Sequence, residues 1–305
     1  MDRAPILGTR GSPLALAQAR LVAAALEAAH GWEAGFVRIL SVKTSGDREQ
    51  SRPLAEIGGK ALWTKELDLA LLAGETDFSV HSMKDVESER PEALSIAAVL
   101  ERADVRDRLI GAKSIEALPQ SARVGTSSPR RAAQLLRLRP DLNIAPIRGN
   151  VETRLAKVAT GEFDATLLAA AGLDRLGRGE TGVAIGVETL MPAPAQAAIG
   201  VECRTDDVMT AQLLGAIDHL PSHRAVTAER IFTRSLGGTC HSPVAALAVE
   251  QHGEMWLRGE ILSEDGAEVV SGEARFAIDD SAAPEPLARE LLAKAPAAIR
   301  SLFEK

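Results

Sequence analysis

Short apolar runs alternate with helix-like segments from residue 5 to residue 168, and this alternation limits the possible folds more than any other feature. Such alternation is typical of α/β layers in which neighbouring strands pair mainly in parallel. The predicted strands are residues 5–7, 36–42, 77–80, 123–125, 143–147 and 165–168. The predicted helices are residues 12–29, 64–73, 129–138 and 151–160.

The chain also repeats itself weakly. GETDFSV at 74–80 is similar to GEFDATL at 161–167, and in both a helix ends at Gly and a strand follows Asp. LGT at 7–9 followed by SP at 12–13 is similar to VGT at 124–126 followed by SP at 128–129. Ser suits an N-cap and Pro suits the first helical position, so both copies predict a strand, a turn and a helix. Because the echoes recur in the same order, we expect two similar lobes that face one cleft.

The C-terminal part has a different pattern. Residues 225–236 read as a helix, and residues 244–249, 255–262 and 274–277 read as strands joined by turns. Residues 285–303 again read as helical. This order predicts a small α+β domain with an antiparallel meander. Its boundary is expected at the turn-like break of residues 220–222.

Charge and composition exclude several classes of function. The formal net charge is −7 and aromatic residues make up 3% of the chain, with no Tyr. A global basic field and stacking platforms for nucleic acid are therefore missing, and we expect no nucleic-acid partner. No apolar run reaches the roughly 20 residues that span a bilayer, and residues 1–6 do not resemble a signal peptide. We expect a cytoplasmic protein without a membrane partner.

Basic residues gather where the predicted strands end. In α/β sheets, ligands bind outside the carboxyl ends of the strands, so these positions predict an anion-binding cleft in an acidic protein. Each residue alone is weak evidence, and an isolated pair such as Arg130 and Arg131 is better explained by two solvated surface side chains. Two arginines in the first turn of a helix oppose its dipole, which favours an anionic partner there. The residues are Arg10, Lys84, Arg130, Arg131, Arg148, Arg154 and Arg175.

Asp85 is the candidate acid. It lies in HSMKD at 81–85, directly after a predicted strand. A carboxylate at a strand end can accept a hydrogen bond from a ligand N–H group and stabilise a cation. A loop Asp paired with its neighbour Lys84 is the alternative, and His81 is assigned no catalytic role.

Cys240 is the candidate reactive thiol. It lies in LGGTCHSP at 236–243, where two glycines leave the thiol uncrowded. A thiol on a glycine-rich loop is more often functional than one in an apolar run, so Cys203 is expected in the core. The sequence contains no CxxC pair and no Cys/His spacing for a metal, so no metal is expected.

These segments together resemble the porphobilinogen deaminase (hydroxymethylbilane synthase) family. The resemblance runs from residue 9 to residue 243 and is most specific in HSMKDV at 81–86 and RGNV at 148–151. It implies two lobes like those of type II periplasmic binding proteins, plus a small C-terminal domain with an antiparallel sheet. The implied domains are residues 1–100 with 198–218, residues 101–197, and residues 219–305, which carry the cofactor cysteine.

The resemblance also implies the chemistry. The family is a transferase of porphyrin and haem biosynthesis that condenses four porphobilinogen units head to tail, releases ammonia at each step, and frees hydroxymethylbilane with water. It carries a dipyrromethane cofactor, here joined by a thioether to Cys240. Asp85 would hold pyrrole N–H groups and stabilise the azafulvenium-like cation that forms as ammonia leaves. A monomer is expected.

Further residues match family positions. Those implied to bind cofactor and substrate are Arg10, Ser12, Lys84, Thr126, Ser127, Ser128, Arg130, Arg131, Arg148, Gly149, Arg154, Arg175 and Gln196. Lys60 and Trp63 are implied to belong to an active-site loop. Ala195 and Ala197 flank Gln196 where the family usually has Gly, and Ala costs stability there if φ is positive. Trp63 and Glu87 also depart, replacing a common Phe and a common Pro.

Two other functions remain open at this point. A non-enzymatic two-lobed receptor for small anions would use the same lobes and arginines but would leave the Cys240 loop unexplained. A Cys-dependent acyl transferase would use Cys240 and His241, and it would leave the arginines without a purpose. The intact mass of the purified protein distinguishes all three, because only the first function predicts two linked pyrrole units on Cys240.

Overall fold

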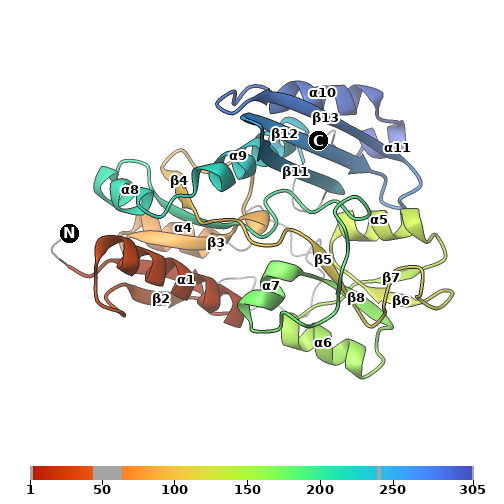
Figure 1. Cartoon of the computed structure of the whole chain (residues 1–305), viewed down its shortest axis with the longest axis horizontal. Helices are drawn as coiled ribbons and strands as arrows, with labels where there is room; N and C mark the ends of the chain where they lie inside the picture. Colours follow the sequence, from red (N-terminus) through yellow and green to blue (C-terminus); the bar gives the residue numbers. More distant parts are fainter. Residues whose placement is uncertain (1–2, 44–63, 239–241, 304–305) are drawn as a thin grey trace. The chain divides into compact units, whose positions relative to one another are not determined.

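A computed structural model describes residues 3–43, 64–238 and 242–303. The chain divides into two compact units. Of the described residues, unit 1 contains 3–43, 64–103 and 197–223, and unit 2 contains 104–196, 224–238 and 242–303. Within these ranges the strands form three sheets, two of mixed direction and one antiparallel (Figure 1).

Unit 1 is built on a mixed sheet. Strand β1 pairs in parallel with β2 and β3, and β10 pairs antiparallel with β3 and β4. The strand order is β2 (Arg38–Val42), β1 (Ile6–Arg10), β3 (Phe78–Ser82), β10 (Ile199–Arg204) and β4 (Leu94–Val99). The carboxyl ends of β1 and β3 therefore meet at one edge, and the residues that follow them can share a pocket.

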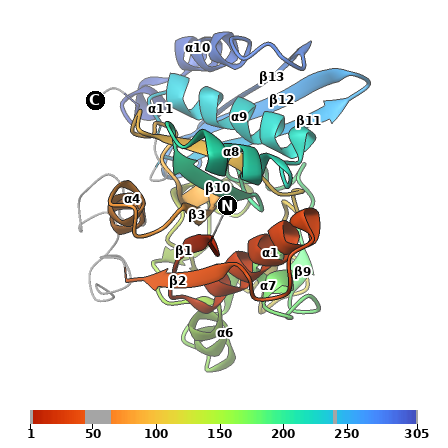
Figure 2. The same ribbon diagram turned by 90° about the vertical axis from the view of Figure 1, so that its left-hand side faces the viewer.

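Helices cover this sheet. Helix α1 (Pro13–His30) begins where Ser12 Oγ accepts from Ala15 N at 3.2 Å, and it ends at Gly31, whose φ is 66°. Figure 2 shows α1 and α4 (Lys65–Leu72) on different sides of β1. The remaining helical elements are η1 (Met83–Asp85) and α8 (Val208–Gly215). The core packs α1 against the sheet, and its fully buried side chains include Leu7, Val22, Leu26 and Phe78.

Unit 2 contains a second mixed sheet of the same design. Strand β6 pairs in parallel with β7 and β8, and β5 pairs antiparallel with β8 and β9. The order is β7 (Asn143–Ala145), β6 (Arg123–Gly125), β8 (Ala165–Ala169), β5 (Asp107–Ile110) and β9 (Val183–Ala184). Position by position, this order and these directions repeat those of unit 1. The two sequence echoes fall on matching strands, β1 with β6 and β3 with β8, which confirms the two similar lobes.

Polar side chains cap the two longer helices of the second lobe, and the cap at Ser128 is as the sequence predicts. Ser128 Oγ accepts from Arg131 N at the start of α5 (Pro129–Leu138). Asn150 Oδ1 accepts from Thr153 N at 2.9 Å at the start of α6 (Val151–Ala159). A short helix, α7 (Ala170–Arg175), follows β8 directly.

The C-terminal part of unit 2 is the expected α+β element. Strands β11 (Val244–Gln251), β12 (Glu254–Leu262) and β13 (Val269–Ala277) form an antiparallel meander. Helices α9 (Leu220–Ser235), α10 (Pro284–Lys294) and α11 (Ala297–Arg300) accompany it. Phe232 of α9 packs so closely on β12 that a Cβ at Gly259 would lie 2.3 Å from the ring. A side chain at this position would expel the ring from the core.

Several boundaries differ from the predictions. The turn expected at residues 220–222 is not observed, because α9 already begins at Leu220 and Pro221 lies in its first turn, where Pro is tolerated. The division between the two units nevertheless falls close to the expected position, between His223 and Arg224. The predicted helix over 285–303 is two helices, since Pro296 cannot continue α10 and instead precedes α11. The sequence patterns did not predict strands β4, β5, β9 and β10. The expectation that Cys203 belongs to the core is confirmed by its full burial.

Candidate active site

Unit 1 holds a pocket at the carboxyl ends of β1 and β3. Its volume is about 70 Å³, and its lining includes Arg10, Ser12, Ser82 and Asp85. Arg10 ends β1, Ser12 caps α1, and Asp85 ends η1 just after β3. Three of the predicted site residues, Arg10, Ser12 and Asp85, therefore share one pocket that combines a cation, a hydroxyl and a carboxylate. Lys84 lies beside Asp85 and is half-buried.

Gln18 also lines this pocket, and sequence reasoning missed it. Its Nε2 lies 2.8 Å from Ser82 Oγ, which joins α1 to the end of β3. A signal was present, because Gln18 is a polar residue on the mainly apolar face of a predicted helix. Such a residue is buried at 3% exposure only because it has a hydrogen-bonding partner.

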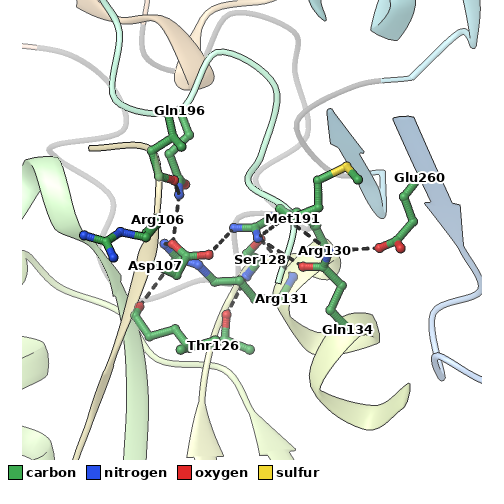
Figure 3. Close-up of polar contacts among 12 residues, drawn as sticks. Arg106, Asp107, Thr126, Ser128, Arg130, Arg131, Gln134, Met191, Gln196 and Glu260 are labelled. Atoms are coloured by element: carbon green, nitrogen blue, oxygen red, sulfur yellow. Dashed lines mark hydrogen bonds and ion pairs between the residues drawn. The ribbon is translucent and has the colours of Figure 1, made fainter. Parts of the chain in front are cut away.

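In unit 2, Arg130 and Arg131 share one buried carboxylate (Figure 3). Arg130 Nη2 donates to Asp107 Oδ2 at 2.8 Å, and Arg131 Nη2 donates to Asp107 Oδ1 at 2.6 Å. Asp107, fully buried, is the first residue of β5. The two arginines lie where the sequence places them, in the first turn of α5, but part of their charge is neutralised inside the protein. Burial lowers the pKa of Arg130, and Asp107 opposes that change.

Backbone and side-chain acceptors fix both guanidinium groups further. Arg130 Nη1 donates to Met191 O at 2.8 Å and to Gln134 Oε1 at 3.1 Å. Arg131 Nη1 donates to Leu167 O at 2.9 Å. These contacts hold the two planes rigidly, so the N–H groups that remain point in set directions. Figure 3 shows Glu260 at the far side of Gln134, whose Nε2 donates to Glu260 Oε1 at 2.9 Å.

The hydroxyl residues Thr126, Ser127 and Ser128 shape the turn between β6 and α5. Ser128 N donates to Thr126 Oγ1 at 3.1 Å, and Ser127 Oγ donates to Ile147 O at 2.8 Å. The second contact ties this turn to the segment that leads into Arg148. The turns after β6 and β7 are thereby joined, and both carry predicted site residues.

Arg148 and Gly149 lie in the next turn, and Arg154 lies in the first part of α6. Gly149 has a φ of 105°, and a Cβ there would lie 2.6 Å from Thr153 Cβ, so only Gly fits. Arg154 Nε donates to Gly149 O at 2.9 Å. Arg148 Nη1 is buried and makes no hydrogen bond with any residue in the described ranges. Arg175 ends α7, and burial lowers its pKa to about 10 against the opposing charge of Asp174.

Gln196 is completely buried and joins the arginine network. Its Nε2 donates to Val105 O at 2.7 Å and to Asp107 Oδ1 at 3.0 Å (Figure 3). On either side of it, Ala195 and Ala197 have φ values of 58° and 72°. The condition under which Ala is expected to cost stability, a positive φ, is therefore met at both positions.

Three predicted residues, Lys60, Trp63 and Cys240, lie outside the described residues. Among the described residues, no group of three or more His, Cys, Asp or Glu side chains could hold a metal ion. In the same ranges, no helix has the length and apolar character that a membrane span needs. The candidate site therefore consists of a pocket around Asp85 in unit 1 and an arginine network around Asp107 in unit 2.

Comparison with known proteins gives the family. Residues 6–212 match the model of the porphobilinogen deaminase dipyrromethane cofactor binding domain, and residues 223–295 match that of the porphobilinogen deaminase C-terminal domain. A porphobilinogen deaminase of Sphingopyxis alaskensis is 56% identical over 97% of this chain and 96% of its own length. One from Paracoccus denitrificans is 50% identical over 95% and 94%.

Solved structures similar to this chain include an ancestral cationic amino acid solute binding protein. It is 18% identical, its TM-score is 0.45, and the match covers 69% of this chain and 86% of that one. The two family models together span most of the sequence, and both relatives are matched over nearly their whole length. The chain therefore belongs to the porphobilinogen deaminase family.

Proposed function

We propose that this protein condenses four porphobilinogen molecules head to tail into hydroxymethylbilane, releasing ammonia at each step and using water to free the product. The observation that carries the proposal is the pocket of unit 1, in which the Asp85 carboxylate and the Arg10 guanidinium line one small space. Porphobilinogen offers a pyrrole N–H and an aminomethyl group that departs as ammonia, and it also bears two acid side chains. An acid and a cation that line one pocket match this combination of groups.

Asp85 has the central role in this proposal. Its carboxylate accepts the pyrrole N–H and stabilises the positive charge that develops as the C–N bond breaks and ammonia leaves. Electrostatic stabilisation of this kind is stronger away from bulk water, and Asp85 is half-buried. Arg10, Ser12 and Lys84 bind and orient the substrate's acid side chains.

The residues of unit 2 fit a dipyrromethane, which bears acetate and propionate groups. Arg130 Nε, Arg131 Nε and Arg148 Nη1 are buried N–H donors that have no hydrogen-bond partner among the described residues. Buried donors of this kind are normally paired, and a carboxylate is the acceptor that a guanidinium group prefers. When bound, the dipyrromethane supplies the pyrrole carbon to which the first substrate is joined.

Other residues complete the binding surface in this proposal. The acids of the cofactor and the growing chain are held by arginines and hydroxyls at strand ends in unit 2 and by Gln196. The cofactor is attached through a thioether to Cys240, and Lys60 and Trp63 belong to a loop at the active site. The proposed unit 2 contacts are Thr126, Ser127, Ser128, Arg130, Arg131, Arg148, Gly149, Arg154 and Arg175.

We propose in addition a monomeric, cytoplasmic enzyme with porphobilinogen as its small-molecule partner. Two cysteines in a family that needs a free thiol for its cofactor suit a reducing compartment. The proposed domains are residues 1–100 with 198–218, residues 101–197, and residues 219–305. Size-exclusion chromatography with light scattering tests the oligomeric state, since a dimer would elute with twice the expected mass.

Intact mass spectrometry of the freshly purified protein tests the cofactor. We expect an excess equal to two linked pyrrole units in the wild type and in Cys203→Ser, and no excess in Cys240→Ser. The Cys203 variant is the matched control because it changes the other thiol. An unmodified mass in active wild-type protein would overturn the cofactor assignment.

Turnover of porphobilinogen tests the role of Asp85. We expect Asp85→Asn to lose at least about a thousandfold in kcat while its fold is retained, because the amide cannot balance a developing cation. Asp206→Asn, an exposed change in the same unit, should leave turnover intact. An anion receptor without catalysis would bind porphobilinogen and release no ammonia in either variant or in the wild type.

A further inference from the structure

Arg90 of unit 1 is a buried arginine that makes hydrogen bonds with all five of its N–H donors, although it is not among the predicted site residues. Its side chain is 8% exposed. Nε donates to Glu202 Oε1 at 2.8 Å, and Nη2 donates to Glu202 Oε2 at 2.9 Å and to Asp68 Oδ1 at 2.5 Å. Nη1 donates to Glu87 Oε2 at 3.1 Å and to Thr64 Oγ1 at 3.3 Å. One side chain thus joins α4, β10 and the segment after η1.

Two residues that Arg90 holds in place, directly or through Glu202, line the Asp85 pocket. Thr64 is in direct contact with Arg90, and His81 is reached through Glu202. His81 Nε2 lies 3.1 Å from Glu202 Oε2, and because a carboxylate only accepts, this nitrogen carries the shared proton. Arg90 itself does not line the pocket. It affects the pocket indirectly, through the lining residues Thr64 and His81.

The same network holds the segment that carries Asp85. Glu87 follows Asp85 by two residues, and its Oε2 accepts from Thr64 Oγ1 at 3.1 Å as well as from Arg90. On the other side of Asp85, Met83 N donates to Ala198 O at 3.1 Å. No side chain caps η1, so these flanking contacts fix its position.

The charges make the arrangement rigid. Burial alone would raise the pKa of Glu202, but hydrogen bonds from His81 and Arg90 lower it to about 2. Burial raises the pKa of Asp68, and Arg90 opposes that rise. Burial likewise opposes the charge of Arg90, but Glu202 and Asp68 together raise its pKa. A buried cation with three acidic partners has no alternative position at similar energy, because leaving any partner unpaired is costly.

We propose that Arg90 is a positioning residue of the Asp85 pocket, which keeps Thr64, His81 and the Asp85 segment at fixed distances from one another during turnover. The inference rests on the proposed function, since it assigns Arg90 a part in the same reaction. A shift of about 1 Å in a reacting group lowers a rate by up to roughly a hundredfold. Movement of the pocket lining after loss of Arg90 should therefore lower kcat more than it weakens substrate binding.

The test compares Arg90→Gln with Arg204→Gln in the cofactor-loaded protein. Arg204 is a matched control because it lies on β10, two residues from Glu202, and pairs with Asp207 at 2.6 Å without lining the pocket. We expect Arg90→Gln to lower kcat by roughly tenfold to a hundredfold, with KM for porphobilinogen changed less than about threefold. Arg204→Gln should change neither parameter once the folded fraction is matched by circular dichroism. Equal kcat values for the two variants would overturn the proposal.

A second pair of variants decides the matter if Arg90→Gln does not fold. Thr64→Val removes only the hydroxyl that bonds Glu87 and Arg90, and Thr64→Ser keeps it. We expect Val to lower kcat and Ser to restore it, whereas a purely structural role predicts equal activity in both. Wild-type protein measured alongside distinguishes failure of this inference from failure of the proposed function. If the wild type forms no hydroxymethylbilane, the proposed function itself is wrong.

Discussion

Arg131 Nη2 and Asp107 Oδ1 lie 2.6 Å apart inside unit 2, and the other oxygen of the same carboxylate lies 2.8 Å from Arg130. Two adjacent guanidinium groups at the start of a helix repel each other and oppose the helix dipole. Asp107 offsets both effects, and Gln196 Nε2 adds a third hydrogen bond at 3.0 Å. The arginine pair is therefore held in position before any ligand arrives.

Asp107→Asn should strongly destabilise unit 2. The amide leaves two buried cations without their shared anion, and breaking a buried ion pair costs about 3–5 kcal/mol. Urea unfolding followed by circular dichroism measures this loss. Asp104→Asn is the control, because Asp104 pairs with the exposed Arg106 at 2.7 Å and should cost about 1 kcal/mol or less. Similar losses in the two variants would contradict the role assigned to Asp107.

Glu229→Gln should weaken the contact between α9 and the segment before Gln196. The carboxylate is fully buried and accepts from Ala195 N at 2.6 Å and from Ala248 N at 2.7 Å. An amide can accept from only one of these N–H groups and turns its own donor towards the other, at a cost of about 1–3 kcal/mol. Glu285→Gln, on the surface of α10, is the matched control in the same urea titration. No difference between the two would be evidence against a double acceptor.

Ala197→Gly and Ala195→Gly should each stabilise the protein by about 0.5–1 kcal/mol. Both alanines have a positive φ, where a Cβ is strained, and the relief exceeds the entropic cost of Gly. Ala198→Gly is the control, because this buried neighbour has no positive φ and should lose stability. Thermal melting gives the order of the three variants. If all three melted below the wild type, the strain would be too small to matter.

The sequence allowed the parallel core of each lobe to be predicted, because that information is local. Ser12, Ser128 and Asn150 lie directly before their helices, and each accepts the capping hydrogen bond that its position implies. Arg10 and Asp85 could be placed near each other because parallel strands end at one edge. These inferences need only a few neighbouring residues.

The partners of the buried charges could not be predicted in this way. Asp107 lies more than 20 residues before Arg130, on a strand that inserts antiparallel into its sheet, and no local pattern reveals that pairing. Glu202 reaches Arg90 across 112 residues for the same reason. Glu87, noted as a departure from the family, turns out to be one of the acceptors of Arg90. Such networks depend on how distant strands are placed in the folded sheet, and not on the spacing of residues along the sequence.

Glu202 should make unit 1 sensitive to acid. Its folded pKa is about 2 against an ordinary value of 4.5, so the carboxylate stabilises the fold above pH 4.5 and loses this effect as pH falls towards 2. At about 1.4 kcal/mol per pKa unit, the contribution is about 3 kcal/mol. Urea unfolding of Glu202→Gln from pH 6 to pH 2 should therefore show a shallower loss of stability than the wild type.

Asp68→Asn should behave oppositely and make stability fall more steeply with acid, because the pKa of Asp68 is raised in the fold and its protonation favours folding at low pH. Parallel curves for the wild type and both variants would mean that neither carboxylate titrates differently in the folded and unfolded chains.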